Sequence, residues 1–315
     1  MKTDTIDVPV VVKPTTLTKV ELQLDWFPEP AHGGFYQAQA RGFYADAGLE
    51  VVIYPGGPGG HPTQKVAAGQ VPFSMGRSDD MMLAAQEGLP VLIVAALMQH
   101  DPQALLMHAS NPVDSFADLD GKAIMAHPGA GWLPYLKKRY DIEFDLMPLS
   151  FGLARFIAEP DLIQACFVTD EPYTVRAGGI AAKTLLIADA GYDPYRVIVA
   201  HAPFASEHPD IVRAFVAATI RGWRDYIDGD PGPAHQLLAQ ENDHLTPDLM
   251  DYSWNEMRRR HLVDGNASAG ESIGHLDPDR LSNHEQLLRE LKVLTSPLPL
   301  EDYVSFEFLP TSMTR

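Results

Sequence analysis

Aromatic and carboxylate side chains follow closely after short apolar runs in this sequence. Lys19–Asp25 alternates apolar and polar residues at the period of two that is typical of a β-strand, and Trp26 comes next. Glu171 follows a second strand-like run, Ala165–Thr169. An aromatic ring provides a flat apolar face, and a carboxylate binds N–H donors strongly in a dry site. The combination favours the binding of a flat, nitrogen-containing heterocycle.

The residues that follow the predicted strands form a set of candidate ligand contacts. In α/β sheets, ligands bind beyond the carboxyl ends of the parallel strands. This rule selects Trp26, Phe27, Gly57, Gly59, Ser78, Asp79, Gln99 and Glu171. The set is completed by His32, Trp132, Phe151 and Tyr195.

Several of these side chains also have a structural alternative. Trp26 and Trp132 are of the type that packs in cores and interfaces. Asp79 is in position to cap a helix, and Glu171 is in position to stabilise the amino terminus of a helix that starts at Pro172. The sequence leaves both roles open for these four residues.

The elements that must position these residues alternate between strand and helix. Strand-like runs at 19–25, 49–54, 71–75 and 90–97 are separated by helical segments, and the alternation restarts after 103–108. Such alternation predicts βαβ units and a parallel sheet. From Pro209 onward the apolar spacing is helical. A chain of 315 residues is long enough for two domains of about 150 residues each, so the predicted class is two-domain α/β with a helical C-terminal region.

Composition and motifs exclude several classes of protein. The net charge of −18 repels phosphate backbones and excludes nucleic acid as a partner. The single cysteine, Cys166, excludes an internal disulfide framework, and no run reaches the roughly 18 apolar residues of a membrane span. The GxGxxG, Walker, GxSxG and HExxH motifs are absent, and no histidine pair has the spacing of a metal site. We therefore expect no catalytic residue, no metal and no cofactor.

Several stretches, taken together and in order, resemble the substrate-binding proteins of ABC importers in the NMT1/THI5-like group. Each stretch alone is a modest signal, but the ordered set covers about residues 20 to 290. The matching stretches are Leu24–Tyr36, Ala40–Leu49, Met98–Gln103, Phe116–Lys122, Trp132–Leu136, Thr169–Tyr173, Ala188–Tyr195 and Phe215–Pro231.

The resemblance implies the two-lobed fold of type II periplasmic binding proteins, with the ligand in the cleft between the lobes. Lobe 1 is expected at 19–108, completed by helices in 203–315, and lobe 2 at 109–202, with crossovers near Gln103–Ser110 and Tyr195–Pro203. The implied function is delivery of a small pyrimidine-like solute, a thiamine precursor or a related heterocycle, to a membrane permease of an ABC importer. The implied protein is a monomer.

The same group contains a second class, the cytoplasmic pyrimidine synthases, which use a pyridoxal-phosphate lysine, a histidine and a cysteine-rich motif. The corresponding stretch Met75–Met82 contains neither lysine nor histidine, and Cys166 is the only cysteine. A Schiff base requires a lysine amine, so we expect a binding protein and not an enzyme. A ligand sensor without a transport role is a third hypothesis.

The location implied by the resemblance is the periplasm or, with a lipid anchor, the extracellular face of the membrane. Met1–Thr18 lacks the continuous apolar segment of a secretory signal peptide. The sequence is therefore compatible with two expectations, a cytoplasmic protein or a chain whose leader precedes Met1.

Overall fold

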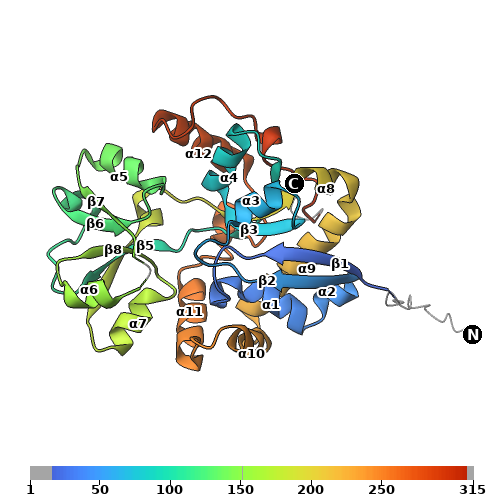
Figure 1. Cartoon of the computed structure of the whole chain (residues 1–315), viewed down its shortest axis with the longest axis horizontal. Coiled ribbons are helices and arrows are strands. Elements are labelled where there is room, and N and C mark those ends of the chain that lie inside the picture. The colour runs from blue at the N-terminus through green and yellow to red at the C-terminus, as the bar shows by residue number, and fades with distance from the viewer. Residues whose placement is uncertain (1–15, 151, 311–315) are drawn as a thin grey trace, which may run out of the picture.

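The computed structural model describes residues 16–150 and 152–310. The chain forms two lobes that lie side by side along the long axis of the molecule, each built around its own five-stranded sheet (Figure 1). We call the lobe that contains the first strand lobe 1 and the other lobe 2. The two α/β lobes and the helical C-terminal region confirm the predicted fold class.

Lobe 1 has the strand order β2-β1-β3-β10-β4. Its strands are β1 (Thr18–Gln23), β2 (Leu49–Tyr54), β3 (Phe73–Arg77), β4 (Val91–Met98) and β10 (Arg196–His201). The helices between them are α1 (Gly33–Ala40), α2 (Phe43–Asp46), α3 (Pro62–Ala67) and α4 (Ser78–Gln86). β1, β2 and β3 run parallel, and β10 runs antiparallel between β3 and β4.

Lobe 2 has the strand order β7-β6-β8-β5-β9. Its strands are β5 (Gln103–His108), β6 (Ala123–Ala126), β7 (Asp145–Pro148), β8 (Ile163–Phe167) and β9 (Ala182–Leu186). Its helices are α5 (Trp132–Tyr140), α6 (Ala154–Ala158) and α7 (Glu171–Ala177). β5 is the antiparallel strand of this sheet and pairs with β8 and β9.

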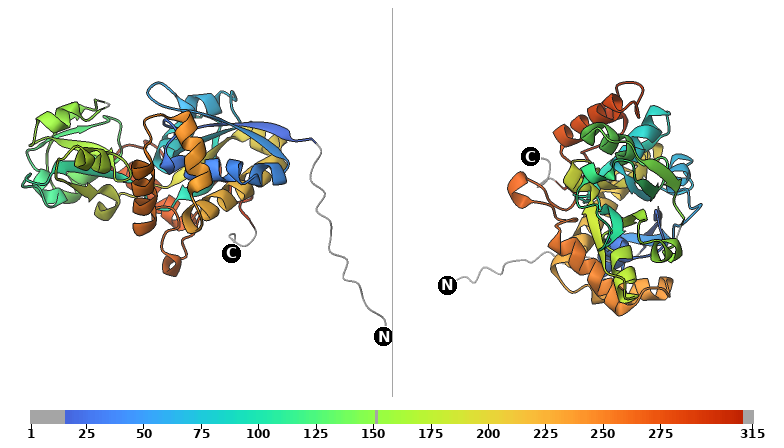
Figure 2. Two further views of the ribbon diagram at one scale, coloured as in Figure 1. Left: turned by 90° about the horizontal axis from the view of Figure 1, so that it is seen from below. Right: turned by 90° about the vertical axis from the view of Figure 1, so that its left-hand side faces the viewer.

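The C-terminal helices complete lobe 1 and reach lobe 2. They are α8 (Ala202–Glu207), α9 (Pro209–Asp228), α10 (Gly232–Glu241), α11 (Pro247–Arg259) and α12 (Pro278–Glu290). α9 packs against α1, whereas α11 and α12 lie along the boundary between the lobes (Figure 2). The Ser253 hydroxyl of α11 donates to the Thr169 carbonyl, and Lys138 of α5 pairs with Glu290 of α12 at 3.3 Å. These contacts tie the lobes together on both sides.

The outer edge of β4 is covered by the C-terminal segment. Almost every residue of this strand is buried. The Ile93 amide donates to the Tyr303 carbonyl at 2.7 Å, and the Gly274 amide donates to the Ala96 carbonyl at 2.9 Å. An apolar edge strand with free backbone groups would invite aggregation, so this cover explains why the C-terminal region belongs to lobe 1.

Two expectations from the sequence differ from the structure. The sheets are mixed and not parallel, because β5 and β10 run against their neighbours. β5 lies in the sheet of lobe 2 and β10 in the sheet of lobe 1. The chain therefore passes from lobe 1 to lobe 2 before Gln103 and returns to lobe 1 before Arg196, not after 108 and 202 as expected. The physical reason is that both crossover segments continue directly into buried strands, whose backbone groups must pair with the sheet they enter.

Helices α1 and α9 approach closely because small residues line their contact. A Cβ atom at Gly222 of α9 would lie 2.3 Å from the Gly34 carbonyl oxygen and 2.6 Å from the Ala38 Cβ of α1. Helix propensity alone favours alanine over glycine by about 1 kcal/mol. At this contact, Gly222→Ala is instead expected to lower the free energy of unfolding by about 1–3 kcal/mol, because the backbones must move apart.

Urea unfolding measures this effect. The matched control is Ala217→Leu, which adds bulk on the exposed side of the same helix and should change stability by no more than about 0.5 kcal/mol. A Gly222→Ala variant as stable as the unmodified protein, or more stable, would contradict the close contact.

Candidate functional site

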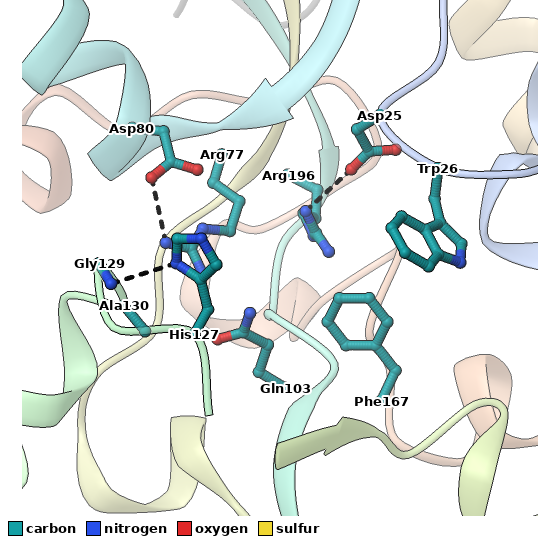
Figure 3. A pocket seen from close by; sticks show the side chains of 10 residues that line it. All are labelled: Asp25, Trp26, Arg77, Asp80, Gln103, His127, Gly129, Ala130, Phe167 and Arg196. Carbon is teal, nitrogen blue, oxygen red and sulfur yellow. Dashed lines mark hydrogen bonds and ion pairs between the residues drawn. The ribbon is translucent and has the colours of Figure 1, made fainter. Parts of the chain in front are cut away.

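Two cavities lie between the lobes, and Trp26 lines both of them. We call the first, of about 260 Å³, the arginine cavity; Asp25, Arg77, Gln103, His127, Phe167 and Arg196 are among its lining residues (Figure 3). We call the second, of about 320 Å³, the carboxylate cavity; Ser150, Gln164, Asp170, Glu171 and Thr174 are among its lining residues.

The arginine cavity is formed where strands of opposite direction end at the same edge. Arg77 is the last residue of β3 and lies opposite Arg196, the first residue of β10. In lobe 2, Phe167 is the last residue of β8 and lies opposite Gln103, the first residue of β5. Because an antiparallel strand begins where its neighbour ends, both lobes present side chains from two strands to the cleft.

Both arginines of this cavity are paired with carboxylates. Arg196 Nη1 lies 3.1 Å from Asp25 Oδ2, and Arg196 Nε lies 3.6 Å from Asp101 Oδ2. Arg77 pairs with Asp79 at 3.0 Å and with Asp80 at 3.2 Å. A fully charged anion would therefore have to compete with resident carboxylates for these guanidinium groups.

Asp25 is held in place by a buried histidine. The Glu29 amide donates to His32 Nδ1 at 3.3 Å, so the proton of the neutral ring is on Nε2, which lies 2.9 Å from Asp25 Oδ1. Burial raises the pKa of Asp25, but the hydrogen bond from His32 and the charge of Arg196 outweigh it and lower the pKa to about 2. His32 is only 1% exposed and acts on the cavity through Asp25.

The carboxylate cavity offers mainly hydrogen-bond acceptors. Glu171 Oε2 accepts a hydrogen bond from the Phe167 amide at 2.8 Å, which fixes the side chain at the start of α7. Burial and the neighbouring charge of Asp170 raise the pKa of Glu171 to about 7. Gln164 is 3% exposed, and its Oε1 atom has no hydrogen-bond partner within residues 16–150 and 152–310. A buried acceptor without a donor is costly, and a ligand N–H would satisfy it.

The raised pKa of Glu171 predicts a pH-dependent stability. The folded protein keeps this proton up to about pH 7, whereas the unfolded chain loses it near 4.5. Folding therefore binds a proton between these values, and the free energy of unfolding should fall as the pH rises through this window. The contribution of Glu171 is at most about 3 kcal/mol.

Urea unfolding between pH 4 and pH 8 checks this prediction against Glu171→Gln, which cannot titrate. Asp170 and Glu29 also have raised pKa values because of burial, but they titrate in both proteins. As the pH rises from 4 to 8, the free energy of unfolding of the unmodified protein should therefore fall relative to that of Glu171→Gln. Parallel pH profiles would show that Glu171 has an ordinary pKa.

Of the residues proposed from the sequence, Trp26 and Glu171 line the cavities. Phe27 is 48% exposed and contacts Trp26 edge-on, with ring centroids 5.5 Å apart. Gly57 lies behind Phe27, where an added Cβ would be 2.8 Å from its ring, and Gly59 lies in the same loop. Neither glycine lines either cavity.

The other proposed side chains are buried, and the structure does not bring them to the cavity walls. Ser78 Oγ accepts from the Tyr195 amide at 3.1 Å, and the Tyr195 hydroxyl oxygen accepts from the Asp277 amide. Gln99 donates to two backbone carbonyls at 2.9 Å, and Trp132 is a core residue. Neither cavity has His32, Ser78, Asp79, Gln99, Trp132 or Tyr195 among its described lining residues, and all six side chains are buried, so their contact with a ligand stays a prediction. Phe151 lies outside the described residues.

Sequence reasoning missed a group of cavity residues for two reasons. Arg196 and Gln103 begin antiparallel strands, and the rule for parallel strands examines only the opposite end. Arg77 and Phe167 are the last residues of their strands, one position earlier than the rule looks. A search for polar residues at both ends of every apolar run would have found Arg77, Gln103 and Arg196.

The described part of the chain, 16–150 and 152–310, holds no group of three or more His, Cys, Asp or Glu residues that could bind a metal ion. Within the same ranges, no helix is long and apolar enough to cross a membrane.

Relatives with known names match most of this chain. It is 26% identical over 314 residues to the riboflavin-binding protein RibY of Chloroflexus aurantiacus, covering 94% of this chain and 87% of that protein. It is 26% identical over 239 residues to the formylaminopyrimidine-binding protein of Halalkalibacterium halodurans, covering 72% of each. It is 25% identical over 297 residues to the yeast 4-amino-5-hydroxymethyl-2-methylpyrimidine phosphate synthase THI11, covering 84% of this chain and 86% of the synthase.

A solved structure has the same fold. The periplasmic aliphatic sulphonate binding protein SsuA from Escherichia coli superposes with a TM-score of 0.66 at 13% identity, covering 91% of this chain and 92% of that one. A family model described as NMT1/THI5 like matches residues 29–232, which is more than half of the chain. The resemblance predicted from the ordered stretches is thereby confirmed, and this chain belongs to the NMT1/THI5-like family.

Proposed function

We propose that this chain is the solute-binding protein of an ABC importer and holds a small nitrogen heterocycle between its lobes. The observation that carries the proposal is the carboxylate cavity, whose lining includes Trp26, Glu171 and Gln164, the last with an Oε1 atom that has no partner among the described residues. A flat ring with N–H donors fits these groups, because it stacks on the indole while its donors meet buried acceptors. Two relatives named for binding riboflavin and formylaminopyrimidine support this ligand class.

The ligand within this class is a pyrimidine-like thiamine precursor or a related heterocycle. The partner of the protein is the membrane permease of the importer. The protein acts outside the cytoplasmic membrane, as a monomer. These statements rest on the family and on the proposed binding function. The acidic cleft also disfavours anionic solutes, since both of its arginines are already paired with aspartates.

The synthase hypothesis has less support, although the yeast synthases are relatives. The stretch 75–82 forms the end of β3 and the start of α4, and its only cation, Arg77, is paired with Asp79 and Asp80. Neither of the two cavities has a lysine among its described lining residues. A lysine Schiff base with pyridoxal phosphate therefore has no amine to form on at this site.

A thermal-shift screen tests the binding function. The probes are riboflavin, the formylaminopyrimidine, 4-amino-5-hydroxymethyl-2-methylpyrimidine and, as the anionic comparison, an aliphatic sulfonate. A ligand at a hundred times its Kd stabilises the folded state by about 2.7 kcal/mol, which is a clear rise in Tm. A rise with a heterocycle and none with the sulfonate is expected. Stabilisation by the sulfonate alone would overturn the proposal.

Glu171→Gln is expected to weaken the binding of the heterocycle by roughly ten- to a hundredfold, or about 1.5–3 kcal/mol. The variant keeps the size of the side chain and one acceptor but removes the charge. Calorimetric titration at pH 8 makes the measurement, because Glu171 is ionised there.

The control is Glu159→Gln, an exposed carboxylate of lobe 2 that pairs with Arg155 and should leave affinity unchanged. If Glu171→Gln binds the heterocycle as tightly as the unmodified protein and only its Tm changes, Glu171 has a structural role at the start of α7.

A further inference from the structure

We propose that the solute passes Trp26 and occupies both cavities, so that this chain selects a heterocycle bearing a second, hydrogen-bond-accepting part over a bare pyrimidine. The inference rests on the proposed binding function and concerns the size and polarity of the ligand. It assigns a role in specificity to the arginine cavity. A solute bound in the carboxylate cavity alone would not contact the residues of the arginine cavity.

The two cavities share one side chain and one strand. Trp26 lines both, and β8 supplies Gln164 to the carboxylate cavity and Phe167 to the arginine cavity. The Phe167 amide donates to Glu171, so the two walls are joined by a hydrogen bond. Volumes of about 260 and 320 Å³ each lie near the lower limit of roughly 300 Å³ for ligand pockets, whereas the pair falls within the usual range.

The cavities have opposite hydrogen-bonding character. The carboxylate cavity accepts, through Asp170, Glu171 and the unpartnered Oε1 of Gln164. In the arginine cavity, the Gly129 amide donates to His127 Nδ1 at 3.1 Å, so Nε2 of the neutral ring carries the proton and is a donor.

The arginine cavity has further donors that face its interior. Figure 3 shows the side chains of Gln103 and His127 directed into the cavity, and a guanidinium nitrogen of Arg196 turned away from Asp25 toward its middle. The Arg196 guanidinium lies 4.9 Å from the centre of the Phe167 ring, which orients it over that side of the cavity.

These features together define the chemistry of the solute. One end carries N–H donors for Gln164 and Glu171, a flat ring lies against Trp26, and the other end carries hydroxyl or carbonyl oxygens for His127 and Arg196. A flavin with its ribityl chain has this arrangement, because its ring imide donates and its hydroxyls accept. A single aminopyrimidine ring has only the first part.

Calorimetric titration with a matched pair of probes tests the inference. Riboflavin and lumiflavin share the isoalloxazine ring and its N–H donor, but lumiflavin carries a methyl group in place of the ribityl chain. Riboflavin is expected to bind at least about tenfold more tightly, as one or two additional hydrogen bonds would give. The third probe is 4-amino-5-hydroxymethyl-2-methylpyrimidine, which fits within the carboxylate cavity.

Variants locate the effect in the arginine cavity. His127→Ala and, separately, Gln103→Ala should each reduce the ratio of riboflavin affinity to lumiflavin affinity several-fold. His127 is exposed, so its variant is expected to fold, and Tm values verify folding for both. The matched control is His244→Ala, an exposed histidine of lobe 1 whose side chain is 94% exposed, which should leave the ratio unchanged.

The outcomes separate this inference from the proposed function. If lumiflavin binds as tightly as riboflavin, or if only the short pyrimidine binds, the solute does not use the arginine cavity and the inference is wrong, while heterocycle binding stands. An unchanged affinity ratio in both variants would also overturn it. If no heterocycle binds, the inference fails together with the proposed function.

Discussion

Trp26→Ala is expected to weaken solute binding by roughly 30- to 150-fold, or about 2–3 kcal/mol, the largest loss for any one side chain of the site. Trp26 is the residue that both cavities share, so under the proposed function its ring would contact the solute whether one cavity or both are occupied. Removing the ring deletes the stacking surface and opens the wall between the cavities to water.

Two variants make this measurement specific to stacking. Trp26→Phe keeps an aromatic face and should recover a large part of the affinity. Phe27→Ala removes the neighbouring ring, which lines neither cavity, and should change affinity far less. Calorimetric titration of all three variants, with Tm values beside it, makes the comparison. Equal losses in Trp26→Ala and Phe27→Ala would mean that the loop as a whole, and not the indole ring, governs binding.

Arg196→Met is expected to lower the free energy of unfolding by about 3–5 kcal/mol, the largest stability effect that we predict. Arg196 lies between Asp25 and Asp101, and Asp101 is 2% exposed. Burial raises the pKa of Asp101, and the charges of Arg196 and Arg77 act against that increase. Without Arg196, a buried carboxylate must either remain charged without its partner or take up a proton.

The double variant Arg196→Met/Asp101→Asn distinguishes an ion-pair effect from a packing effect. Removing both charges should restore part of the stability, because Asp101, the more buried carboxylate partner of Arg196, is then neutral, while Asp25 keeps its hydrogen bond with His32. The deficit of the single variant should also shrink at acid pH, since a protonated Asp101 needs no cation. Urea unfolding at pH 5 and pH 8 measures both effects. A double variant as unstable as Arg196→Met would attribute the loss to the packing of Arg196 against Phe167.

The fold class and the family were predictable because their signals are local or ordered along the chain. The strand at 18–23 shows the period of two, and α9 and α11 carry apolar stripes at helical spacing, so each segment specifies its own element. The strand-end rule also placed Trp26 and Glu171 near a binding site, and both line the cavities. Their contact with a ligand remains a prediction.

The same rule does not determine which way each side chain points. Ser78 and Asp79 follow β3 as predicted, but they begin α4 and turn into the protein, where Asp79 accepts a hydrogen bond from Tyr192 at 2.6 Å. Arg77, one position earlier, lines the arginine cavity. Position along the chain indicates closeness to the cleft, but the direction of each side chain depends on what packs behind it.

The sequence by itself predicted most of the strands and helices, their order, the family, and the acidic and aromatic character of the candidate site, but it treated the segments that form β5 and β10 as crossovers. The tertiary structure alone decided that β5 and β10 run antiparallel to their neighbours, β5 in lobe 2 and β10 in lobe 1. This arrangement brings Gln103 and Arg196, at the amino ends of these strands, to the cleft. The tertiary structure also decided that Gln164 has a buried acceptor for which the described part of the chain provides no donor. The reason is physical: a short apolar run specifies an extended backbone, but strand direction and partner follow from contacts between residues far apart in the chain, such as Arg196 with Arg77 and Gln103 with Phe167.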